Sequence, residues 1–230
     1  MNFTGFQPET LDFLIAVRSH NSKTWFEEHR EEYERVLLEP MRALVSELSG
    51  YMRIVDPLLE TRPAVGKTIA RIFRDTRFSK DKSLFRDHLW LTFKRPIAEW
   101  QDSPAYFFET NPGGYSFGMG FYVASRETMA EFRKRIDRNP AEFLEVVRPL
   151  RDSSLQLEGE LYKRAPGTAH PEAIARWYQR KNFYLVRNGP PGELLFSHQL
   201  VDEIIQQFET SVPFYNYLWE VIAAKPLPVR

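Results

Sequence analysis

The polar residues best suited to bind a ligand are concentrated in one stretch of the chain, Arg71 to His88. Its eighteen positions hold six Arg or Lys residues and three Asp residues. Guanidinium groups carry forked donors that match carboxylate and phosphate oxygens, and Lys adds a point charge. The stretch therefore predicts a pocket for a small anion, and a phosphate-bearing compound would fit this chemistry. The candidate ligand-binding residues are Arg71, Arg74, Asp75, Arg77, Ser79, Lys80, Asp81, Lys82 and Arg86.

The same charges allow two other interpretations. In the first, the cations pair with Asp75, Asp81 and Asp87, and the segment is an ion-paired loop of a non-catalytic interaction or regulatory domain. Pairs of this kind are common and add little stability when they are exposed. In the second, which ranks lowest, these carboxylates hold a divalent metal for phosphoester hydrolysis, which needs two or more of them to converge. The sequence identifies no catalytic residue and no cofactor, so whether the protein is an enzyme stays open.

Other motifs with a chemical meaning are weaker. Gly66-Lys67-Thr68 resembles the end of a phosphate-binding P-loop, but Thr61 stands where the earlier glycine is required. The run also leads into a predicted strand, whereas a P-loop opens a helix. His198 and Asp202 have the spacing of two metal ligands on a helix, but no third ligand accompanies them. We therefore expect neither a P-loop nor a metal site.

Short predicted strands must position the polar segment. They are runs rich in aromatic or β-branched residues: Lys67–Phe73, His88–Lys94, Ala105–Thr110, Tyr115–Val123, Gln156–Tyr162 and Asn182–Arg187. The polar segment leaves the first of these and leads into the second, and such connections commonly present functional groups. Pro112-Gly113-Gly114 predicts a hairpin turn. Gly118 and Gly120 leave a flat strip on one strand face, which we expect to serve packing.

Helices are predicted on both sides of the strands from apolar residues spaced by three and four. The first two run over Pro8–Ile15 and Phe26–Met52, and Pro40 is expected to kink or split the second. Further helices lie in the middle of the chain. Ser197 is expected to cap the last helix and Pro213 to interrupt it.

Composition narrows the class of protein. Lys plus Arg and Asp plus Glu number 31 each, and this zero net charge argues against a dedicated nucleic-acid or anionic-membrane binder. The absence of Cys excludes disulfides, Cys-ligated metals and thiol nucleophiles. Neither a signal-peptide pattern nor an apolar stretch of membrane-spanning length is present, so we expect a cytoplasmic protein. We predict a single α+β domain over residues 1–230, with a mainly antiparallel or mixed sheet packed with helices from both termini and the middle, and leave its oligomeric state open.

The run Arg74-Asp75-Thr76-Arg77-Phe78-Ser79-Lys80-Asp81-Lys82 resembles the central signature of the family called domain of unknown function 2461. Further similarities lie at Phe3–Phe6, Asn21–Phe26, Gly113–Gly120 and Arg164–Pro171. The family is widespread in bacteria, and the resemblance implies its fold and makes the polar segment the expected site. It implies no mechanism. After Lys82 the family usually has a Pro-Tyr-Lys-like stretch, whereas this chain has Leu84-Phe85-Arg86 and therefore no Tyr hydroxyl at Phe85.

Overall fold

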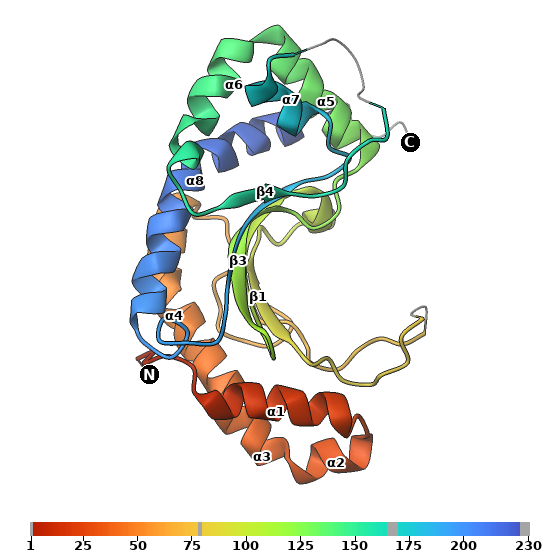
Figure 1. The fold of residues 1–230 in the computed structure, drawn as a ribbon, viewed down its shortest axis with the longest axis vertical. Coiled ribbons are helices and arrows are strands. Elements are labelled where there is room, and N and C mark those ends of the chain that lie inside the picture. Colours follow the sequence, from red (N-terminus) through yellow and green to blue (C-terminus); the bar gives the residue numbers. More distant parts are fainter. Residues whose placement is uncertain (1, 78–79, 165–169, 226–230) are drawn as a thin grey trace. The chain divides into compact units, whose positions relative to one another are not determined.

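The computed structural model describes residues 2–77, 80–164 and 170–225, and its helices and strands confirm the predicted α+β class (Figure 1). The chain divides into two compact units. The first unit comprises Met1–Phe93, Phe107–Phe117 and Asn188–Ile205, and the second comprises Lys94–Tyr106, Gly118–Arg187 and Gln206–Arg230. Within the described ranges, no helix is both long and apolar enough to cross a membrane.

Five strands form an antiparallel sheet in the order β1-β2-β3-β5-β4. They are β1 (Leu89–Phe93), β2 (Pro104–Asn111), β3 (Gly114–Phe121), β4 (Gln156–Glu158) and β5 (Tyr184–Gly189). Pro112 and Gly113 join β2 to β3 as the predicted hairpin requires. β4 pairs with β5 through Leu157 and Leu185, whose side chains share one face of the sheet.

Two of the predicted strands differ from the structure. The strand predicted over Lys67–Phe73 is wrong, because the chain turns at Gly66 (φ +79°) and residues 68–70 make only two hydrogen bonds with β1. These bonds run from Ala70 N to Trp90 O (2.9 Å) and from Thr92 N to Thr68 O (2.8 Å). The strand predicted over Gln156–Tyr162 is shorter, since β4 ends before Gly159, whose φ of +127° turns the chain out of the extended conformation.

The first unit begins with a set of packed helices. They are α1 (Pro8–Ser19), α2 (Lys23–Glu28), α3 (Arg30–Tyr33), the π-helical turn Glu34–Leu38 and α4 (Glu39–Val55). The break expected at Pro40 takes the form of that π-helical turn, in which Glu39 N donates to Glu34 O instead of to the carbonyl four residues back. Pro40 has no N–H to donate and its ring would clash with a regular preceding turn, so the widened turn lets the helical chain continue into α4.

The second unit gathers its helices around an aromatic cluster. It contains α5 (Arg126–Arg138), α6 (Pro140–Val147), α7 (Glu172–Tyr178), the 3₁₀ turns Trp100–Asp102 and Arg148–Arg151, and most of α8 (Gln199–Ala223). The buried Phe132 of α5 contacts Phe143, Phe183 and Phe214, with ring centroids 5.7, 4.9 and 6.5 Å away. These rings pack α5, α6 and α8 together beside Phe183, which directly precedes β5.

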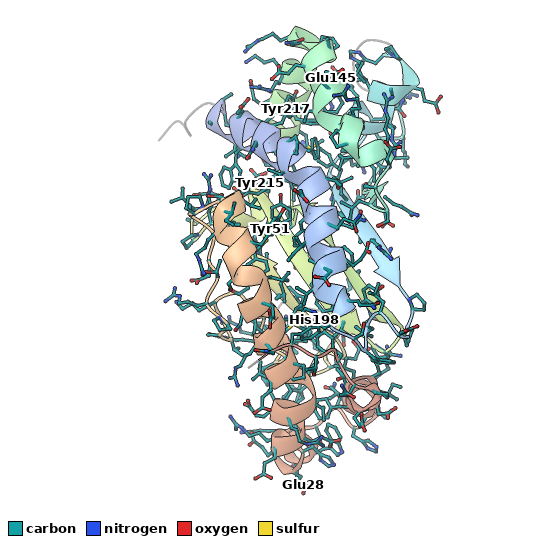
Figure 2. All side chains as sticks on the ribbon, turned by 90° about the vertical axis from the view of Figure 1, so that its left-hand side faces the viewer. Glu28, Tyr51, Glu145, His198, Tyr215 and Tyr217 are labelled. Atoms are coloured by element: carbon teal, nitrogen blue, oxygen red, sulfur yellow. The ribbon has the colours of Figure 1, made fainter. Side chains whose placement is uncertain are left out.

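Both predictions for the last helix are wrong. Helix α8 passes through Pro213 without interruption. Tyr215 and Tyr217, labelled in Figure 2, follow the proline by two and four residues. Both tyrosines are at most 2% exposed, so their burial holds the helix together although Pro213 supplies no hydrogen bond. Ser197 is not the N-cap residue, because α8 begins two residues later at Gln199, and the Ser197 hydroxyl donates to the carbonyl of Leu194 (3.4 Å).

The glycine strip of β3 serves packing, as expected. A Cβ at Gly118 would overlap the carbonyl oxygen of Leu185, and a Cβ at Gly120 would overlap the backbone of Tyr184. The main chain of β5 therefore occupies the space that side chains would fill, and the strip is not open to a ligand.

Candidate functional site

The polar segment forms a two-legged arm, defined as residues 71–88, whose described parts are 71–77 and 80–88. Its legs are joined by hydrogen bonds from Arg74 N to Leu84 O (2.7 Å) and from Arg86 N to Ile72 O (2.9 Å). Phe73 and Phe85 are bridge partners between the legs. The returning leg leads directly into β1 (Figure 1), so the sheet fixes one end of the arm.

The amide of Asn21 and the ring of Phe26 hold the base of the arm against the N-terminal helices. Asn21 Oδ1 accepts hydrogen bonds from the backbone N–H groups of Leu84 (2.6 Å) and Phe85 (3.0 Å). Asn21 Nδ2 donates to the carbonyls of Phe85 (2.8 Å) and Val17 (3.1 Å). The ring of Phe26 stacks on that of Phe85 at 4.1 Å and 11°. Asn21 and Phe26 therefore position the arm, a role that sequence reasoning missed although both lie in one of the stretches shared with the resembling family.

A concavity of about 700 Å³ opens beside the outgoing leg of the arm. Its lining residues are Gly66, Arg71, Phe73, Arg74, Asp75, Thr76, Arg77, Arg86 and Trp90. Four guanidinium groups face one carboxylate there. We call this concavity the arm pocket.

Two of its arginines are held by carboxylates. Arg77 makes a fork with Asp75 through Nε–Oδ1 (3.0 Å) and Nη2–Oδ2 (2.7 Å), and this hydrogen bonding lowers the pKa of Asp75 from 3.8 to about 2. Arg74 Nη1 lies 3.2 Å from Asp81 Oδ2. The pKa of Asp81 is also below its usual value, mainly because the backbone N–H and hydroxyl of Ser83 donate to it and further because of Arg74.

Two other cations fasten the arm to itself. Arg86 Nη1 donates to the carbonyls of Arg71 (2.8 Å) and Phe73 (2.7 Å), and its guanidinium lies 5.0 Å from the centre of the Trp90 ring. Lys82 Nζ donates to the carbonyl of Thr76 (2.9 Å). Part of the positive charge of the segment is thus used to hold its conformation.

Three donor groups of the arm have no partner within the described ranges. The exposed guanidinium of Arg71 makes no hydrogen bond or ion pair with any residue that the structure describes, and neither does the ammonium of Lys80. Arg74 Nε is buried and has no hydrogen-bond partner among the same residues. The arm pocket therefore combines paired arginines with one arginine, Arg71, whose donors are available to a ligand.

The sequence-predicted candidates are brought together only in part. The arm pocket collects Arg71, Arg74, Asp75, Arg77 and Arg86. Lys80, Asp81 and Lys82 lie in the arm but not in the pocket lining, and Ser79 lies outside the described residues. The apolar walls, Phe73 and Trp90, were not anticipated, because a strand pattern does not reveal that Phe73 is 54% exposed.

The weaker motifs form no site in the described chain. Gly66-Lys67-Thr68 occupies a turn and opens no helix, and the Thr68 hydroxyl donates to the carbonyl of Glu60 (3.3 Å). His198 precedes the first residue of α8 (Figure 2). Among residues 2–77, 80–164 and 170–225, no three His, Asp or Glu side chains lie close enough together to hold a metal ion.

A cluster that sequence reasoning missed lies in the second unit. His170 Nε2 lies 3.0 Å from Asp137 Oδ1, and the hydroxyl of Tyr178 donates to Asp137 Oδ2 (2.9 Å). Burial and the bond to Asp137 both raise the pKa of Tyr178. No pattern in the sequence pairs these residues, since they lie in three separate segments, and within the described residues Asp137 accepts from Tyr178 and contacts His170.

Comparison with known proteins agrees with the resemblance seen in the sequence. Residues 9–217 match the family model described as conserved hypothetical protein (DUF2461). The match includes Asn21, Phe26 and the whole arm. No curated protein and no solved structure matches the chain.

Proposed function

The chain belongs to this family of conserved hypothetical proteins, and we propose that its arm pocket binds a small phosphate-bearing anion. The observation that carries the proposal is the set of four guanidinium groups facing one carboxylate in a concavity of about 700 Å³. Such a volume lies within the range of small-molecule sites in proteins.

The electrostatics of the pocket favour an anion over a neutral ligand. Asp75 neutralises one of the four arginines through its fork with Arg77, and Asp81 reaches Arg74 from outside the pocket lining. Arg71 has no such partner in the described chain. Its exposed guanidinium can therefore donate to a ligand oxygen without first breaking a contact within the protein.

The walls of the pocket suit a ligand that is more than a bare ion. Phe73 and Trp90 offer apolar surface beside the guanidinium groups. Sites for small molecules typically combine such surface with a few polar groups that fix orientation. A phosphate attached to an organic body would use both.

Isothermal titration calorimetry with a panel of phosphate compounds tests the proposal. The panel consists of inorganic phosphate, pyrophosphate, a sugar phosphate and nucleotides, with acetate as a control for charge alone. We expect at least one phosphate compound to bind, and Arg71→Gln to weaken its binding by roughly ten- to a hundredfold, because charge-assisted hydrogen bonds are lost. The matched control is Arg35→Gln, which changes an exposed arginine of the π-helical turn that does not line the pocket.

The control should bind like the wild type. If no compound of the panel binds, or if Arg71→Gln and Arg35→Gln weaken binding equally, the arm pocket is not the site of a phosphate-bearing ligand.

A second candidate function, a non-catalytic interaction domain, is favoured by the internal pairing of the arm. The Asp75–Arg77 fork, the Arg74–Asp81 pair and the Lys82–Thr76 bond hold charges that a ligand site would leave available. If this is the function, the titrations above yield no binding and the arm binds a macromolecular partner instead. We rank it second because it leaves Arg71 without a role.

A further inference from the structure

A second concavity, of about 210 Å³, lies within the second unit where helical segments cover β4 and β5. Its lining residues are Val147, Leu150, Arg151, Leu155, Leu157, Ala173, Arg176, Trp177 and Leu185. We call it the apolar cavity. None of these residues lines the arm pocket, so a ligand site here is independent of the function proposed for that pocket.

Among the residues that line the apolar cavity, only Arg151, Arg176 and Trp177 have side chains that can form hydrogen bonds. Leu157 and Leu185 are cross-strand partners and form its sheet side. Leu150 and Trp177 belong to the helical side, and each of these four residues is at most 8% exposed. A ligand inside would therefore be held by apolar contact alone.

The exposed side of the apolar cavity, which we call its mouth, is charged, whereas the interior is apolar. Arg151 and Arg176 are exposed, and neither side chain forms an ion pair or hydrogen bond with any residue in the described parts of the chain. Asp152 follows Arg151 and Glu172 lies one helical turn before Arg176, yet no ion pair joins either acid to these arginines. The third nearby cation, Arg180, is used structurally, because it donates to the carbonyls of Leu157 (3.0 Å) and Gly159 (2.7 Å).

The size of the interior limits the ligand. An apolar cavity of about 150 Å³ accepts benzene, so 210 Å³ accommodates an apolar body of about six carbons. The two guanidinium groups at the mouth match a carboxylate, which is planar and accepts forked hydrogen bonds. We propose that the apolar cavity binds a monocarboxylate with a short aliphatic or aromatic body, the body against Leu157 and Leu185 and the carboxylate at Arg151 and Arg176.

Three probe compounds separate the contribution of the apolar body to binding from the contribution of the carboxylate. Hexanoate has both the chain and the charge, hexanol has the chain, and acetate has the charge. Measured by NMR titration of the full chain, hexanoate should bind about tenfold or more tightly than either of the others, because neither buried methylenes nor ion pairing alone suffices. Equal binding of hexanoate and hexanol, or no binding of hexanoate, would overturn the proposal.

Two variants and one control variant locate the binding. Ala173→Leu places a larger side chain into the apolar cavity and should abolish hexanoate binding, whereas Ala175→Leu, on the same helix but outside the lining, should not. The double variant Arg151→Gln/Arg176→Gln changes only exposed side chains and should bind hexanoate no better than hexanol. If Ala173→Leu fails to fold, the double variant still decides, and wild-type affinity for hexanoate in that variant contradicts the proposal.

Discussion

At the scale of single residues, Asn21 has the greatest influence on the candidate site. Its amide makes four hydrogen bonds, three of them to the backbone of the returning leg of the arm. Elsewhere between the arm and the N-terminal helices, Arg18 adds one ion pair with Asp87 (2.6 Å). The position of the arm pocket therefore depends on a side chain that does not line it.

We predict that Asn21→Ala destabilises the protein by about 1–3 kcal/mol, because two backbone N–H groups lose their acceptor. Chemical denaturation followed by circular dichroism measures the effect. Asn188→Ala, at an exposed position, is the matched control and should change the free energy of unfolding by less than about 0.5 kcal/mol. Equal effects of the two substitutions would mean that Asn21 does not hold the arm.

The fork between Asp75 and Arg77 predicts a pH dependence of the arm. The pKa of Asp75 is lowered from 3.8 to about 2, so the pair is present above pH 3.8 and is lost as the pH falls through about 2. The side chains are exposed and the effect on global stability should be small. NMR titration of the Asp75 carboxyl carbon should give a midpoint near 2, and Arg77→Gln should return it towards 3.8. A wild-type midpoint near 3.8 would contradict the fork.

At the scale of elements, the sequence predicts what local patterns determine and misses what tertiary contacts decide. The strand His88–Lys94 is confirmed as β1 because apolar residues alternate there, and the hairpin is confirmed because its turn chemistry is local. The strand predicted over Lys67–Phe73 is wrong because residues 66–68 form a turn and the residues after it pair with β1 only briefly. The arm was identified from its charges, but its pairing pattern depends on contacts across its two legs.

Helix α8 gives the clearest example of tertiary packing overriding a local signal. A proline inside a helix costs roughly 3 kcal/mol, yet Phe214, Tyr215 and Leu218, all buried, follow Pro213 directly. Fully burying side chains of this size contributes roughly 1.5–3 kcal/mol each, which together exceeds the cost of the proline.

We therefore predict that Pro213→Ala stabilises the protein by about 1–3 kcal/mol, because it restores a backbone hydrogen bond at an exposed position of α8. Thermal and chemical unfolding measure the change. Asn216→Ala, also exposed on α8, raises helix propensity without adding a backbone donor and should contribute less than about 1 kcal/mol. A loss of stability in Pro213→Ala would indicate that the packing of α8 requires the proline.

At the scale of the whole molecule, the net charge is zero although one site has a local excess of positive charge. The chain has 31 cationic and 31 acidic residues, yet the arm pocket has four arginines and one carboxylate. The zero net charge therefore argues against an extended anionic partner, but it gives no information about binding of a small anionic ligand. The family match over residues 9–217 spans both units, so the arm pocket and the apolar cavity both lie within the matched region.

The most direct test of an anion site at the arm is to observe its arginine side chains by NMR while pyrophosphate is added. We predict that the guanidinium resonances of Arg71 shift progressively and saturate, because an acceptor enters the position where the described chain supplies none. The Arg35 resonance should stay in place. Unchanged Arg71 resonances, or shifts of the same size at Arg35, would contradict an anion site in the arm pocket.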